Sequence, residues 1–439
     1  MKMAWLILWA APLGLAQGPL ALSMKRAVEM AISPEGNTRI QLTGEALKQA
    51  QSKSAESRAA LLPDVEAAFS DQSRTENLSA LGLSKISVPI PGFEFPTFVG
   101  PFTTVDARVT GTQNILDFSA LRMFQASKVG ISAARSDLDT AGEQVAGQVA
   151  RAYLAAVKAD TDVDTAQANV TLSEAVLKQA ENQKAAGTGT GIEITRAKVQ
   201  LANDGQRLLV ARNADRTAHL QLLRAIGLRL DTEIELTDRM QYTPVDAVTL
   251  EQARAQALAQ RPELKAQQER ETTARLSASA TRLERLPTVA AFGDYGSNGT
   301  ALDHSLPTRT VGIQVRVPLF DGGRRDARRE ESASQYRAEK VRTNDLREQI
   351  ELDVRLALDE LQSADDEVKV ARDGLSLSED ELTQARRRYD AGVAIGVEVT
   401  DAQTRLERAR DNQTEALYLY NLARLDLAQA MGKIRSLLQ

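Results

Sequence analysis

Two periodicities of hydrophobic positions alternate along this chain of 439 residues. In the longest helical pattern, apolar side chains recur every seven residues, at Val354, Leu361, Val368, Leu375, Leu382 and Tyr389. An earlier segment follows the same spacing, with Val149, Ala156, Val163, Val170 and Leu177. A strict seven-residue apolar repeat predicts long helices that coil around neighbouring helices.

The placement of proline indicates how long these helices are. No proline occurs between Pro101 and Pro244, and none follows Pro318. Because proline breaks a helix interior, both stretches permit very long helices. We expect one helix to begin near Ala120 and another near Gly323, each lasting about 65–70 residues, or roughly 100 Å at about 1.5 Å per residue.

Between the helical patterns, hydrophobic positions alternate with a period of two, which predicts strands. Residues 105–112 place Val105, Ala107, Val109 and Gly111 on one face and Asp106, Arg108, Thr110 and Thr112 on the other. Residues 311–317 oppose Val311, Ile313, Val315 and Val317 to Gln314 and Arg316. Partner strands are expected at 62–71 and 286–296, with hairpin loops at 88–102 and 297–307 and shorter helices at 23–60 and 249–284.

The two halves of the chain resemble each other. "LSEAVLKQAENQKAAG" at 172–187 and "LSEDELTQARRRYDAG" at 377–392 align without a gap, and the match continues to "AIG" at 225 and "AMG" at 430. This register predicts a duplication. We expect a first repeat at 17–228, a linker at 229–248 and a second repeat at 249–439, each repeat holding a helix, two strands and a long helical hairpin.

The N-terminus and the composition limit the class of protein. Residues 1–16 combine a lysine, an apolar run and small residues, which predicts a cleaved signal peptide. The absence of cysteine excludes disulfides, thiolate metal sites and cysteine catalysis. A net charge of -5 gives no indication of nucleic-acid binding. An exported protein without a nucleic-acid partner is expected.

Four strands with one apolar and one polar face allow two architectures. They form a small sheet on a soluble core, or they contribute to a barrel whose outside meets lipid. Because about eight strands are needed to close a barrel, a barrel requires several copies, and a trimer supplies twelve strands. In that case the polar side chains line the lumen, at Asp106, Arg108, Gln314 and Arg316, and the apolar ones face lipid, at Val109, Val315 and Phe118.

Several motifs occur in one order and then again. "LSMKRAVEMA" near the start is echoed by "VTLEQARAQALAQRPEL", two strands open with "LP", and "VPLFDGG" stands at 317–323 before the second long helix. With the two glycine turns, this order resembles the TolC-like outer-membrane factors.

The resemblance implies a mainly α homotrimer in the outer membrane that extends into the periplasm. Long coiled helical hairpins would form an α-barrel, and four strands per protomer would form a twelve-stranded β-barrel. The function implied is an exit duct for small molecules or proteins, in a tripartite efflux pump or a type I secretion system. Its partners would be a periplasmic adaptor (membrane fusion) protein, an inner-membrane transporter and outer-membrane lipid. The alternative is a soluble periplasmic coiled-coil adaptor or scaffold.

The resemblance also assigns roles to the two glycine turns, which would form a periplasmic tip. The adaptor would contact both turns, at Ala186, Gly187, Gly191, Ala391, Gly392 and Gly396. Glu398 and Asp401 are three residues apart and share a helix face. In a trimer they would form two carboxylate rings that narrow the pore, or they simply complement the helix dipole.

A latch between the two hairpins is expected at the same tip. Glu193 could accept a hydrogen bond from Tyr389. Ala394 stands where the best-known members of the family carry an arginine, so part of the latch is missing. The candidate substitutes are Arg196, Arg386, Arg387 and Arg388.

The sequence gives no indication of an enzyme, a cofactor or a metal site. "GTGTG" at 187–191 resembles a phosphate loop, but a helix rather than a strand precedes it. His219 and His304 have no ligand-like spacing and are interpreted as ordinary surface groups.

The signal-peptide interpretation is testable by fluorescence. Both tryptophans of the chain, Trp5 and Trp9, lie inside the predicted signal. The mature protein is therefore expected to emit only tyrosine fluorescence, whereas a tryptophan-type emission spectrum from the purified mature protein would contradict cleavage after Ala16.

Overall fold

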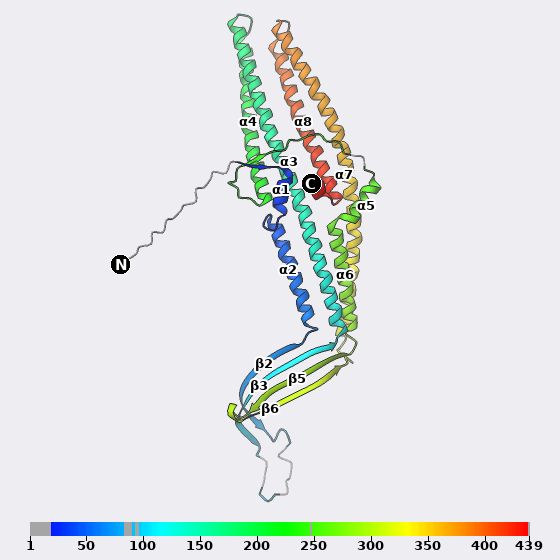
Figure 1. The fold of residues 1–439 in the computed structure, drawn as a ribbon. Helices are drawn as coiled ribbons and strands as arrows, with labels where there is room; N and C mark the ends of the chain where they lie inside the picture. The colour runs from blue at the N-terminus through cyan, green and yellow to red at the C-terminus, as the bar shows by residue number, and fades with distance from the viewer. Residues whose placement is uncertain (1–18, 83–89, 93–95, 246–247, 438–439) are drawn as a thin grey trace, which may run out of the picture. The chain divides into compact units, whose positions relative to one another are not determined.

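A computed structural model describes residues 19–82, 90–92, 96–245 and 248–437. The predicted signal peptide and part of the predicted loop at 88–102 lie outside the described residues. The described chain is mainly helical, and its elements are drawn in Figure 1.

The order of the elements in the two halves is nearly the same. The first half contains β1 (Leu20–Leu22), α1 (Met24–Ile32), α2 (Thr38–Ala59), β2 (Asp64–Asn77), β3 (Phe98–Leu116), α3 (Phe118–Ala185) and α4 (Gly191–Ile226). The second contains β4 (Ile234–Leu236), α5 (Leu250–Gln260), α6 (Pro262–Leu283), β5 (Thr288–Gly299), a 3-10 helix (Leu302–His304), β6 (Ser305–Arg316), α7 (Arg324–Asp390), α8 (Gly396–Ala430) and α9 (Ile434–Leu437). The expected long helices are confirmed, with 68 residues in α3 and 67 in α7.

The chain divides into two compact units, and each unit takes segments from both halves. The helical unit holds the described residues up to Glu45, Ser136–Leu264, and the residues from Asp345 onward. The sheet unit holds Ala46–Arg135 and Lys265–Asn344. The proposed repeat boundaries therefore describe the sequence and not the compact units.

Small and branched side chains form the core of the helical unit. Along α3, Val145, Val149, Ala156 and Tyr153 are buried and pack with Leu222 and Ile226 of α4. Along α7, Val354, Val368, Leu382 and Tyr389 are buried, and Leu361 and Leu375 pack against the same clusters. The seven-residue repeat therefore marks the buried stripe of a helix, as expected from its spacing.

A short parallel strand pair joins the start of the described chain to the predicted linker. Leu20 of β1 pairs with Ile234 of β4, and Leu22 pairs with Leu236. Sequence analysis missed both strands, because three-residue segments are too short to show a period. The linker at 229–248 is therefore partly ordered by pairing rather than being only a connection.

The sheet unit contains an antiparallel sheet with the strand order β2-β3-β5-β6. The pairing places Ala67 opposite Val109, and Val109 opposite Tyr295. The four predicted strands are confirmed, and each is longer than the pattern indicated. The edge strands of this sheet are β2 and β6. Within the described residues, no helix has both the length and the apolarity needed to cross a membrane.

One face of this sheet presents apolar side chains to its surroundings. The members that are more than one-third exposed include Val65, Phe69, Val109, Tyr295, Val311, Ile313 and Val315. Val311 is the most accessible of these, with 84% of its surface exposed. An exposed apolar face of this extent marks a surface that meets another protein or a lipid phase.

The hydroxyl of Tyr153 offers a test of the helical unit. Tyr153 is fully buried, donates to the Leu22 carbonyl at 2.8 Å and accepts from the Asp238 N–H at 3.3 Å. Tyr153→Phe leaves the Asp238 N–H without this acceptor and is expected to destabilise the protein by about 1–3 kcal/mol. Thermal unfolding followed by circular dichroism measures the loss. The control, Tyr295→Phe, alters a tyrosine that is 66% exposed, and equal losses in the two variants would contradict the assignment.

Candidate functional site

The two hairpin turns have the same backbone geometry. Gly187 and Gly392 adopt positive φ angles of 79° and 72°. The N–H of Thr188 donates to the Gln183 carbonyl at 3.0 Å, and the N–H of Val393 donates to the Arg388 carbonyl at 3.0 Å. These bonds close a helix end around a left-handed glycine, so the structure contains both glycine turns. Of the predicted adaptor-binding residues, Ala186, Gly187, Gly191, Ala391 and Gly392 are exposed, and Gly396 is half-buried.

Glu193 lies at the point where the two hairpins meet. Its carboxylate accepts the Thr190 N–H at 2.9 Å and so completes a capping box at the start of α4. The same carboxylate accepts a backbone hydrogen bond from Gly396, the first residue of α8. The hydrogen bond from Thr190 is the main cause that holds the pKa of Glu193 below its ordinary value. One acidic side chain therefore caps the N-termini of two helices from different hairpins.

The predicted hydrogen bond between Tyr389 and Glu193 is not formed in this part of the described chain. Tyr389 is buried with the α7–α8 cluster, and burial, followed by the charge of Glu193, raises the pKa of its hydroxyl. The hydrogen bonds of the Glu193 carboxylate come from main-chain N–H groups instead. A second contact between the hairpins runs from Gln179 Nε2 of α3 to Asp390 Oδ1 at the end of α7, at 2.5 Å.

The two candidate gate acids have different surroundings. Glu398 forms an ion pair with Arg388 at 2.8 Å, which joins α7 to α8 within one hairpin. Asp401, one turn further along the same helix face, is exposed. Arg388 is therefore the member of the candidate arginine set that the structure pairs with Glu398, and it pairs within its own hairpin.

The four residues predicted to line a lumen share one face of the sheet. Arg108 contacts Asp106 at 3.2 Å, Thr308 at 3.3 Å and Asp294, which come from three strands. Gln314 lies opposite Ala290, and Ala290 lies opposite Asn114. Asn114 is an even number of residues from Asp106 and Arg108 along β3, so all these side chains project from the same face. Arg316 lies two residues beyond Gln314 and so projects to the same side. The ion pairs identify this face as the polar one.

A buried polar cluster joins the hairpins further from the turns, and sequence analysis missed it. Ser173, Asp204, Gln403 and Glu407 are each 1% exposed. Ser173 donates to Asp204, Gln200 donates to Glu407 at 3.2 Å, and Arg207 donates to Glu407 at 2.7 Å. Burial, followed by the charge of Asp204, raises the pKa of Glu407. The seven-residue repeat was recognised only along α3 and α7, and none of these four residues occupies one of its positions.

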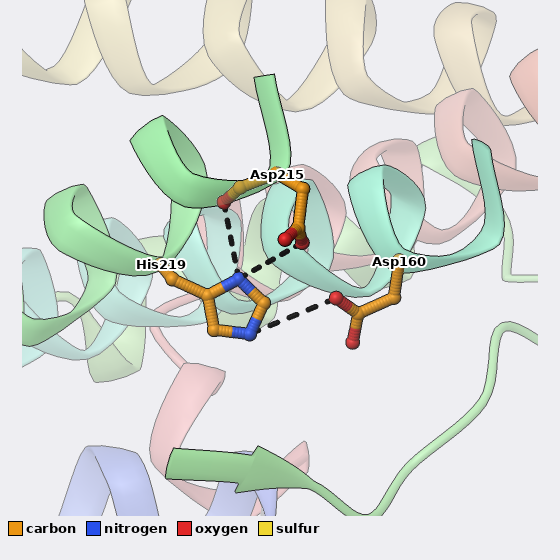
Figure 2. Close-up of side chains that lie close together, drawn as sticks. All are labelled: Asp160, Asp215 and His219. Carbon is orange, nitrogen blue, oxygen red and sulfur yellow. Dashed lines mark hydrogen bonds and ion pairs between the residues drawn. The ribbon is translucent and has the colours of Figure 1, made fainter. Parts of the chain in front are cut away.

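His219, interpreted from the sequence as an ordinary surface group, is only partly exposed and has two carboxylate neighbours. Its side chain is 23% exposed and lies between Asp215 and Asp160 (Figure 2), at 3.1 Å and 3.6 Å. The spacing of four residues between Asp215 and His219 was visible in the sequence, but Asp160 lies on another helix. His304 is 75% exposed beside Asp303, as expected for a surface group.

With this geometry in place, the comparisons with known proteins identify the class. The family model for outer membrane efflux proteins matches residues 36–228 and 253–433, so the chain belongs to that family. The chain is 24% identical to the pyoverdine export outer membrane protein OpmQ of Pseudomonas putida over 396 residues, which cover 88% of this chain and 79% of that protein. It is 22% identical to the alkaline protease secretion protein AprF of Pseudomonas aeruginosa over 316 residues, which cover 70% of this chain and 65% of that protein.

A solved structure shares the fold of this chain. The structure superposes on the CmeC outer membrane channel of Campylobacter jejuni with a TM-score of 0.80 at 16% identity, covering 93% of this chain and 85% of that one. The protein is an outer-membrane efflux or secretion channel that extends into the periplasm. The family consists of channels and not of enzymes. The alternative of a soluble periplasmic adaptor is not supported.

The shared cap makes a prediction about the turns. Glu193→Ala removes the acceptor for the first N–H groups of α4 and α8, each of which is worth about 1 kcal/mol. Hydrogen exchange at Thr190 and Gly396 is expected to accelerate about fivefold in both peptides, as measured by mass spectrometry. Glu181→Ala, at an exposed acid of α3, is the control.

The pH dependence of the same cap follows from the lowered pKa of Glu193. The stabilisation is complete above the ordinary glutamate pKa of about 4.3 and is lost as the pH falls through the lower folded value. Hydrogen-exchange rates at the two turns, corrected for the intrinsic pH dependence of exchange, are expected to rise only below pH about 4.3. Faster exchange in one turn alone, or in the Glu181→Ala variant, would contradict a cap shared by both helices.

Proposed function

We propose that three copies of this chain assemble into one duct, with the sheets joined edge to edge in the outer membrane. The single observation that carries the proposal is the sheet itself. It has two edge strands, one face with ion-paired polar side chains, and one exposed apolar face. Four strands are too few to close around a lumen, and twelve are enough.

The two faces would have different environments in such an assembly. The side of Asp106, Arg108, Gln314 and Arg316 would face water in the lumen, and the side of Val109 and Val315 would face lipid. Phe118, the first residue of α3, is 40% exposed and would lie at the end of the lipid-facing band. The chain would perform no chemistry on its cargo.

The helical turns would engage an adaptor. Five of the six predicted contact residues are exposed, and glycine leaves the backbone of each turn accessible. A periplasmic adaptor protein would bind these turns and connect them to an inner-membrane transporter. The relatives OpmQ and AprF are named for exporting pyoverdine and for secreting alkaline protease, so the cargo class is left to the transporter.

The acidic residues at the start of α8 would form the gate. Because Arg388 partly compensates the charge of Glu398, Asp401 would carry most of the uncompensated negative charge of the two carboxylate rings. An exposed ion pair is worth little, so Glu398 remains available to a passing cation. The position that corresponds to Asp401 in the first repeat is Arg196, 205 residues earlier. The ring of Asp401 side chains would therefore come from the second repeat alone.

The edge-to-edge assembly is testable by crosslinking, since the chain has no cysteine. Gln72→Cys on β2 is combined in turn with Thr308→Cys, Thr310→Cys or Gly312→Cys on β6. A short bis-maleimide is expected to yield dimers and trimers on denaturing gels. Thr110→Cys with Asp294→Cys is the matched control, because these residues pair within one copy and their crosslink leaves a monomer. Monomers alone from every edge pair would refute the assembly.

The gate is testable in planar bilayers. Glu398→Gln with Asp401→Asn is expected to enlarge the single-channel current, because the carboxylate rings no longer narrow the pore. Cation selectivity is expected to weaken, because the charge that attracts cations is removed. Of the single changes, Asp401→Asn is expected to have the larger effect on selectivity. Glu360→Gln, at an exposed acid of α7, is the control. Unchanged current and selectivity in the double variant would leave these acids with a helix-dipole role alone.

A further inference from the structure

A cluster with metal-ligand chemistry lies in the helical unit, away from the turns. Asp160 belongs to α3, and Asp215 and His219 occupy successive turns of α4 (Figure 2). One ring nitrogen and one oxygen of each carboxylate lie within 4.8 Å of one another. The three side chains are partly buried rather than free in solvent.

The hydrogen bonds of His219 set the direction of its free nitrogen. Nδ1 lies 3.1 Å from the Asp215 backbone carbonyl. Because a carbonyl only accepts, Nδ1 carries the proton in this bond, and in the neutral ring Nε2 carries a lone pair. Nε2 lies 3.6 Å from Asp160 Oδ1. A histidine that donates one ring N–H to a carbonyl and presents the other nitrogen is the usual arrangement of a metal-bound imidazole.

The carboxylate of Asp215 adds a second, independent observation. Its Oδ1 atom is buried and has no hydrogen-bond donor among the described residues. It faces His219 Nδ1 at 3.1 Å, but that N–H points to the backbone carbonyl. A buried carboxylate oxygen without a donor is costly unless a cation compensates it.

We propose that Asp160, Asp215 and His219 bind one divalent first-row transition-metal ion between α3 and α4. One imidazole and two carboxylates suit Zn²⁺ and its neighbours better than Mg²⁺ or Ca²⁺, which prefer oxygen ligands alone. The Nε2–Oδ1 separation of 3.6 Å fits an ion about 2.0–2.1 Å from each atom. The ligand atoms of the three residues all lie within 4.8 Å of one another, so Asp215 is close enough to share the same ion.

The second repeat shows that the duplication alone does not produce this cluster. The residues 205 positions later are Asp365, Tyr420 and Arg424. Asp365 there accepts from the Tyr242 hydroxyl at 2.7 Å and pairs with Lys369 at 2.7 Å. Asp365 is already paired with a lysine, and Tyr420 and Arg424 stand in place of the other two ligands, so the second repeat offers no equivalent cation site. The site would therefore clamp only the first hairpin of each copy.

The competing explanation is a protonated imidazole that bridges two carboxylates without a metal. The two explanations differ in what Zn²⁺ does. A metal site binds the ion and ties α3 to α4, so added Zn²⁺ raises the unfolding temperature. A bridging imidazolium needs no ion and gains nothing from it.

The experiment titrates the full chain, purified in detergent with chelator and then freed of it, with ZnCl₂ in a calorimeter. Wild type is expected to bind one ion per protomer and to unfold at a higher temperature with Zn²⁺ present. His219→Gln and Asp160→Asn are expected to lower the affinity at least 10–100-fold and to abolish the thermal shift. His304→Gln is the matched control and is expected to behave as wild type.

Two results would overturn the proposal. One is wild type that shows neither binding nor a thermal shift. The other is binding that His219→Gln and Asp160→Asn leave unchanged, or that His304→Gln abolishes, since the ion would then be held elsewhere. Circular dichroism of each variant without metal confirms that a lost affinity does not reflect a lost fold.

Discussion

The structure depends on one constraint, which is that the unpaired backbone N–H and C=O groups along the two sheet edges need hydrogen-bond partners. The sheet ends at β2 and β6, and β6 carries Val311 and Ile313 with 84% and 69% of their surfaces exposed. In water such an edge pairs with other chains indiscriminately. In lipid each unsatisfied backbone group costs several kcal/mol. In the proposed assembly, pairing of β2 with β6 of a neighbouring copy would satisfy both edges at once.

The helices face a different problem, since both sides of a thin helical wall meet water. Only narrow stripes are available for burial, and alanine is the most common residue in the two largest buried clusters, beside leucine, isoleucine and valine. Polar contacts then specify how the hairpins meet. Asp204 and Glu407 are buried and share Arg207, whose side chain is 57% exposed, so removing the arginine leaves two buried carboxylates without their ion-pair partner. Near the turns, the polar contacts between the hairpins include the Glu193 cap and the Gln179–Asp390 bond.

The sequence predicted what depends on local period and on backbone conformation. The heptads located α3 and α7, the alternation located four strands, and the glycines located two turns, because each signal lies within one element. What it missed depends on pairs of residues far apart in the chain. The β1–β4 pair, the contact of His219 with Asp160, and the main-chain donors of Glu193 join segments that no periodicity connects. Tyr389 shows the same limit, since its heptad position correctly predicted burial but not the identity of its neighbours.

The two repeats also show which features a duplicated hairpin must keep and which can diverge. Gly187 and Gly392 keep the same φ and the same bonds, because any other residue is strained there. Glu193 and Glu398 occupy equivalent positions yet have different partners, a neighbouring helix end for one and Arg388 for the other. The reason is geometric: each hairpin meets a different neighbour, so equivalent side chains have different surroundings. The glycine turn is therefore common to both repeats, whereas the charge at the tip differs between the two repeats of one chain.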